Sequence, residues 1–227
     1  MKKYQPLIYC LTLFLGISLS GFLSGGAFAE TVPTEAIAAA QAGLLSFLEP
    51  LTPEDMGHFG FAPGDKISDA ILGTPFQLYT ITPSKLLNAE DNTSVSSLIS
   101  PTGQWFFPIV LNGTSRAILT VEKMDGEWQA VTMGRAGLAI EMEKLNRQWP
   151  KAKGYEPKLI AIYQAASYFF TILEVDSKNF TPLTFDGTGF AGYRQKTGPE
   201  YASTTSLSSM LGPLKETVEE NINLNRQ

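Results

Sequence analysis

The sequence is poor in the residues that most catalytic and metal sites use. It has one cysteine, Cys10, and one histidine, His58, in 227 residues. Zinc sites draw on clusters of cysteine, histidine and carboxylates, and a serine nucleophile needs a base beside it. His58 is the candidate for a general base or a metal ligand, but in the glycine-flanked turn at 56–60 we interpret it as a surface or half-buried ring. The sequence therefore assigns no catalytic residue, no metal ligand and no cofactor.

Positive charge is also scarce. The chain carries 17 lysines and arginines against 22 acidic residues, a formal net charge of -5. Nucleic acids and anionic lipid headgroups both attract proteins through a basic surface. The acidic balance argues against either partner and leaves a protein, a peptide or a small ligand.

The N-terminus has the pattern of a secretory signal. Lys2 and Lys3 precede an uncharged run over residues 4–29, which closes in Ala27-Phe28-Ala29. A basic start, an apolar run and an A-x-A end are typical of a bacterial signal peptide. We therefore expect residues 1–29 to be removed after Ala29.

An uncleaved membrane anchor is the alternative, because the run is long enough to span a bilayer. The Gly/Ser-rich stretch 20–26 and the A-x-A tripeptide favour cleavage. The mature chain would then lack Cys10 and could form no disulfide; losing two of the 17 basic residues leaves 15 against 22 acidic residues, a net charge of -7. We expect 30–227 to form a single exported domain, periplasmic or extracellular, with a membrane as partner only if the leader is kept.

The stretch 105–149 organises the predicted fold. Residues 105–111 are apolar at every position, which predicts a strand covered on both faces near the middle of a sheet, with an irregularity at Pro108. Asn112-Gly113 and Asp125-Gly126 both tolerate the positive φ of two-residue hairpin turns. Three antiparallel strands are therefore expected, the third at 128–133.

The second of these strands, 116–123, shows alternation. Ala117, Leu119 and Val121 share one face, and Ile118 is the single apolar residue on the other. This pattern predicts a strand buried on one face and wet on the other.

Three helices are predicted around the sheet. The first runs over 34–48 with Thr34 as its cap, the second over 136–149, and the third over 213–224 with Pro213 at its first turn. Their expected buried residues are Ile37, Leu44, Phe47 and Leu48 in the first, Leu138, Met142, Leu145 and Trp149 in the second, and Leu214, Val218 and Ile222 in the third.

Further strands are expected at 74–81, 158–175 and 180–185. The stretch 158–175 also fits a helical stripe, but its β-branched and aromatic residues and a small-residue break at 164–167 favour a hairpin. The whole pattern predicts an α+β fold: an antiparallel sheet of about five to seven strands, with an N-terminal helix, a helix near 136–149 and a C-terminal helix packed against it.

Two short motifs match known sequence patterns but lack the structural context that those patterns require. Residues 187–192 read G-x-G-x-x-G, but neither a following helix nor a βαβ unit is expected there, so we interpret them as a flexible turn. Asp186 opens an Asp-Gly-Thr-Gly sequence similar to that of aspartic proteases, yet no second copy supplies the paired carboxylate. Glu174, Asp176 and Asp186 could serve a two-carboxylate glycosidase, but their spacing does not select them.

The sequence thus favours an exported, non-catalytic binding or interaction protein of unknown ligand. The alternative is a carboxylate-dependent hydrolase of the cell envelope. A concave pocket with two or more converging carboxylates would indicate the enzyme, whereas an apolar groove or an exposed sheet edge would indicate binding.

Overall fold

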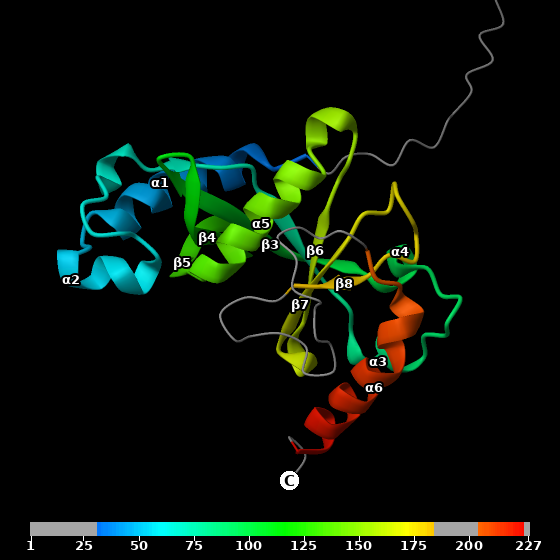
Figure 1. Cartoon of the computed structure of the whole chain (residues 1–227). Helices are drawn as coiled ribbons and strands as arrows, with labels where there is room; N and C mark the ends of the chain where they lie inside the picture. Colours follow the sequence, from blue (N-terminus) through cyan, green and yellow to red (C-terminus); the bar gives the residue numbers. More distant parts are fainter. Residues whose placement is uncertain (1–30, 184–203, 225–227) are drawn as a thin grey trace, which may run out of the picture. The chain divides into compact units, whose positions relative to one another are not determined.

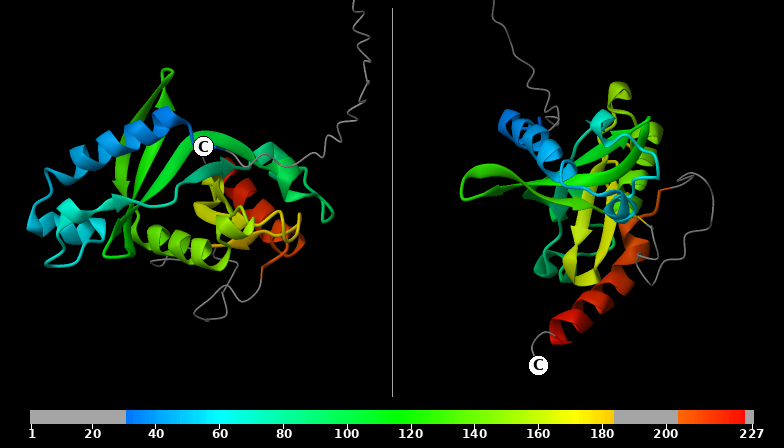
Figure 2. Two further views of the ribbon diagram at one scale, coloured as in Figure 1. Left: turned by 90° about the horizontal axis from the view of Figure 1, so that it is seen from above. Right: turned by 90° about the vertical axis from the view of Figure 1, so that its left-hand side faces the viewer.

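One sheet, with helices on both faces, makes up the part of the chain that the structure describes (Figures 1 and 2). The structure is a computed structural model, and it describes residues 31–183 and 204–224. The helices are α1 (Thr34–Leu48), α2 (Pro53–Met56), α3 (Pro83–Leu87), α4 (Val95–Leu98), α5 (Ala136–Gln148) and α6 (Leu207–Leu224). The strands are β1 (Ile71–Leu72), β2 (Phe76–Thr80), β3 (Ser100–Leu111), β4 (Thr114–Met124), β5 (Glu127–Gly134), β6 (Lys158–Ile162), β7 (Ser167–Thr171) and β8 (Thr181–Pro182).

The sheet has the order β5-β4-β3-β2-β6-β7-β8, and β1 pairs with β3. The pairing of β2 with β6 is parallel, with Leu78 opposite Leu159, and the other described pairs are antiparallel. The predicted α+β class and mostly antiparallel sheet are confirmed. The described residues add to that prediction an eighth strand and one parallel pair.

Both predicted hairpin turns are present. Asn112 and Gly113 have φ of 52° and 74°, and Asp125 and Gly126 have φ of 52° and 91°. Positive φ at both central residues is the requirement of a type I′ turn, which Asn-Gly and Asp-Gly meet at low cost. These two turns set the register of β3, β4 and β5.

The structure corrects the prediction for β4. Ile118 is 1% exposed and packs with residues of α5, whereas Ala117, Leu119 and Val121 pack on the opposite face with residues of α1. The middle of β4 is therefore buried on both faces. The prediction of a wet face was wrong because a helix covers each side of the strand at this point.

Helix α5 matches its prediction. Leu138, Met142, Leu145 and Trp149 are all buried, and the Trp149 ring lies 5.4 Å from that of Phe170 in β7. This stripe packs against residues of β2, β3, β4, β6 and β7, so α5 joins strands that are distant in sequence.

The predictions for α1 were wrong in two details. Pro33 holds the N-cap position and Thr34 is already helical, with no side-chain cap. Ile37 is 38% exposed, and the helix turns small residues towards the sheet instead. The reason is close approach: a Cβ on Gly43 would overlap the Cβ of Ala130 in β5. The buried residues of α1 are Ala36, Ala40, Gly43, Leu44 and Leu48.

The predicted hairpin at 158–175 is confirmed as β6 and β7. A 3-10 turn at Tyr163–Ala165 joins them, and Ala166 closes it with φ of 47°. Of the strand expected at 180–185, Thr181–Pro182 is a strand, and residues 184 and 185 lie outside the described residues.

Helix α6 begins earlier than expected. It starts at Leu207, so Pro213 lies inside the helix rather than at its first turn. Leu207, Met210 and Leu211 are buried with Leu214 against β6 and β7, and this packing outweighs the weak helix propensity of Ser and Gly before the proline.

Within 31–183 and 204–224, no helix combines the length and the apolar character needed to cross a bilayer. The predicted leader lies outside the described residues, as do Asp186 and the glycine motif at 187–192. What was expected of these residues therefore remains a prediction.

Candidate functional site

Where the structure describes them, the residues considered for catalysis from the sequence lie at exposed positions. His58 is exposed in the 3-10 turn Gly57–Phe59 that follows α2. In the described part of the chain, no group of three or more His, Cys, Asp or Glu side chains is arranged to hold a metal ion.

Two of the carboxylates named for a hydrolase, Glu174 and Asp176, accept hydrogen bonds from backbone amides. The backbone N–H of Glu156 donates to Oε2 of Glu174 at 3.4 Å, and the N–H of Lys178 donates to Oδ1 of Asp176 at 2.9 Å. Both carboxylates are exposed. Asp176 fits a structural role in its own turn, and Glu174 fits one in joining two segments 18 residues apart.

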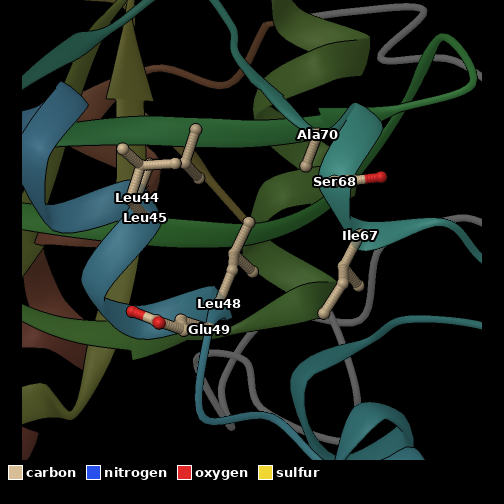
Figure 3. Close-up of a pocket in the computed structure, with 7 residues that line it drawn as sticks. All are labelled: Leu44, Leu45, Leu48, Glu49, Ile67, Ser68 and Ala70. Carbon is tan, nitrogen blue, oxygen red and sulfur yellow. The ribbon is translucent and has the colours of Figure 1, made fainter.

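A concave apolar site lies instead beside the C-terminal half of α1 (Figure 3). It encloses about 420 Å³. Leu44, Leu45 and Leu48 from α1 form one wall, and the segment that leads into β1 forms the other. The lining residues are Leu44, Leu45, Leu48, Glu49, Ile67, Ser68 and Ala70.

The second wall is fixed to the sheet by polar contacts. The backbone N–H of Ala62 donates to Oδ2 of Asp65 at 2.7 Å, and Nη2 of Arg116 in β4 lies 3.4 Å from Oδ1 of the same carboxylate. The Asp65 side chain is 7% exposed, so this ion pair is largely shielded from water. Gly60, with φ of 83°, lies so near the Arg116 carbonyl that a Cβ would overlap it. These contacts hold the loop that carries Ile67 and Ala70.

The site is lined mainly by aliphatic side chains. Its polar groups are the carboxylate of Glu49 and the hydroxyl of Ser68, both on exposed residues. Leu45 is 72% exposed, a large apolar side chain left in water at the wall of a cavity. Such an arrangement can remove an apolar group from water but supplies no pair of groups for acid-base chemistry.

A second cluster lies on the α5 side of the sheet. Arg135, which precedes α5 with φ of 57°, places its guanidinium 5.1 Å from the ring centre of Phe106 and 5.9 Å from that of Tyr168. Burial and the nearby Tyr168 raise the pKa of Tyr163, and the positive charge of Arg135 opposes them. Tyr163 is therefore protonated at neutral pH and is no ready nucleophile.

The pocket was not predicted from the sequence. Leu44 was expected on the inner side of α1, and no sequence pattern pointed to the segment around Ile67 and Ala70. The adjacent Leu44-Leu45 pair was a usable signal, because neighbouring residues on a helix point about 100° apart and one of them had to leave the core.

Comparisons with protein families, with curated proteins and with solved structures found no match to this chain.

Proposed function

We propose that this protein is a non-catalytic binding protein whose pocket beside α1 takes a small apolar ligand or an apolar side chain of a peptide. The observation that carries the proposal is the aliphatic lining of the pocket, five of whose seven residues are Leu, Ile or Ala. The volume of about 420 Å³ falls within the range of ligand sites, roughly 300–1,000 Å³.

The charges around the pocket fit binding better than hydrolysis. Glycoside hydrolysis by paired carboxylates needs two of them facing one bond. The pocket has one carboxylate, Glu49, and it is exposed to solvent. Nothing in residues 31–183 and 204–224 favours the hydrolase alternative.

We also propose that the protein acts outside the cytoplasm. This part rests on the leader at 1–29, with its two lysines, its uncharged run and its A-x-A end. Mass spectrometry of the protein purified from the producing cell should find Glu30 as its first residue, and an intact Met1 would contradict export by this route.

The pocket proposal is tested by filling the cavity. Ala70 lines one wall, so Ala70→Trp should occupy the space and weaken the binding of the dye 1-anilinonaphthalene-8-sulfonate by about tenfold or more. Dye fluorescence measures the dissociation constant, and circular dichroism confirms that the variant is folded.

Ala38→Trp is the matched control. Ala38 is exposed on α1 and does not line the pocket, so the same substitution there should leave dye binding unchanged. Equal binding by both variants and the wild type, or no binding by the wild type, would rule out this site.

A further inference from the structure

The pocket beside α1 is apolar along its walls and negatively charged at one end. Glu49, the C-cap residue of α1, is the one charged residue among the seven described residues that line it. Glu49 is exposed, so its charge lies in water at the opening rather than inside the cavity. Figure 3 shows its carboxylate turned away from the wall that carries Ile67 and Ala70.

The end of α1 has the same sign as this carboxylate. The carbonyl groups of the last turn point out of a helix C-terminus and give it a partial negative charge. Pro50 has no N–H to offer the carbonyl of Ser46, and the last turn of α1 contains no basic residue. In the described part of the chain, no ion pair involves Glu49. The carboxylate and the helix end therefore both favour a cation at the opening.

The opposite wall adds little net charge. Lys66 and Asp69 flank its lining residues, and both are exposed and of opposite sign. Asp65 is already paired with Arg116 at 3.4 Å. The sign of the charge at the opening is thus set by Glu49.

The apolar and the charged parts of the site are neighbours on α1. Leu45 and Glu49 are four residues apart, and the backbone of Glu49 is still helical, so their side chains lie one above the other. Leu45 is 72% exposed, an apolar surface beside a carboxylate. A molecule that fills the cavity against Leu45 therefore reaches Glu49 after one helical turn, about 5 Å.

The lining suits an alkyl chain better than a peptide backbone. Each residue of a peptide brings an N–H and a C=O that need partners when water is removed. The described lining has two polar side chains, those of Glu49 and Ser68. An alkyl chain needs no such partner and gains free energy by leaving water.

We propose that the ligand of this pocket is a small cationic amphiphile: an alkyl chain that occupies the cavity, joined to an ammonium group that lies beside Glu49. This inference rests on the proposed binding function of the same pocket and adds the charge and the form of the ligand. An anionic head group would meet the same carboxylate with the wrong sign, so alkyl carboxylates and alkyl phosphates are disfavoured.

Two probes with the same tail and opposite head groups test the proposal on the protein purified from the producing cell. Decyltrimethylammonium and decyl sulfate are titrated calorimetrically below their micelle concentrations, and circular dichroism confirms that the protein stays folded. The ammonium should bind about five- to tenfold more tightly, because an exposed charge acts modestly, once as attraction and once as repulsion. Salt at about 1 M should shrink this preference, since it screens exposed charges beyond about 3 Å.

Two charge variants locate the effect. Glu49→Gln should reduce the preference to about twofold or less and should tighten the binding of the anionic dye. Glu35→Gln removes the same charge from the first turn of α1, at the other end of the helix, and should leave the preference unchanged. An equal loss in both variants would mean that the overall charge of the protein attracts the ammonium, and it would overturn the proposal.

The outcomes separate the cationic ligand from the pocket itself. Probes that bind equally well, both weakened by Ala70→Trp, overturn the cationic ligand and leave the proposed binding function standing. Failure of both probes to bind, or binding that Ala70→Trp does not weaken, contradicts the pocket. The dipeptide acetyl-Leu-Lys-amide carries the same charge on a peptide backbone, and tighter binding by it than by the ammonium probe would overturn the alkyl ligand.

Discussion

The half of the sheet made of β3, β4 and β5 and the half made of β2, β6, β7 and β8 are held together in different ways. In the first, each strand follows its neighbour through a two-residue turn. In the second, β2 pairs with β6 across about 80 residues of chain, and α6 covers strands that precede it by more than 35 residues. Local turn chemistry sets the pairing in the first half. In the second half it sets the β6–β7 hairpin, and long-range burial of apolar side chains brings β2 and α6 to that hairpin.

This difference shows which parts of the fold a sequence can reveal. Asn112-Gly113 and Asp125-Gly126 indicate the position and the type of their turns. The three-strand meander was therefore predictable. Residues 159–162 are apolar at every position, and apolar character does not show that β2 lies alongside. The parallel pairing of Leu78 with Leu159 therefore had no local signal.

The strongest way to test whether the two halves fold as one unit is Phe169→Ala. Phe169 is fully buried in the second half and stacks on Phe180 at 4.5 Å between ring centres, so its loss should cost about 3–5 kcal/mol of unfolding free energy. Trp105 and Trp128 lie in the first half, on its α1 side, whereas Trp149 packs on Phe170 of the second half, so the comparison is made in a Trp149→Phe background.

Urea unfolding followed by tryptophan fluorescence and by far-ultraviolet circular dichroism makes the comparison. If one cooperative unit is present, both signals shift by the same amount in Phe169→Ala. A fluorescence transition left at its wild-type midpoint would mean that the halves unfold separately.

A smaller effect is expected where α1 meets the first half. Gly43→Ala should cost about 1–3 kcal/mol, because the new Cβ overlaps that of Ala130 and outweighs the gain in helix propensity. The double variant with Ala130→Gly should recover much of the loss, since it reopens the space. Chemical denaturation measures the unfolding free energies of the wild type and of both variants. A Gly43→Ala protein as stable as the wild type would contradict the close packing.

The smallest effect concerns Tyr163, which is on the turn of the second half. Its raised pKa means that the folded state holds the phenolic proton more tightly than the unfolded state does. The contribution to stability is therefore complete below the ordinary tyrosine pKa and is lost as the pH rises through the higher, folded value. Absorbance titration should show Tyr163 ionising above the ordinary value, and Arg135→Gln should move it higher still.

In that titration, Tyr163→Phe identifies the transition by its disappearance. A transition that stays in place in Arg135→Gln would show that the guanidinium does not act on this phenol.

The packing of α1 explains why its inner side was predicted wrongly. Ranking residues by apolar size selected Ile37, but the helix approaches β5 so closely that Gly43 and the alanines fit there and Ile37 does not. Leu45 was then left at the pocket. The pocket and the wrong prediction for the inner side of α1 have the same cause, a close contact that sequence periodicity does not show.

The two ends of the sheet also differ in a way that bears on assembly. The strand at the end opposite β5 is Thr181–Pro182, and a proline has no N–H to offer a further strand. A protein with two long, receptive edges can add copies without limit and grow into a fibre. Among the described residues, β5 is the longer of the two end strands, so the two ends of the sheet do not offer equal ladders to a neighbouring chain.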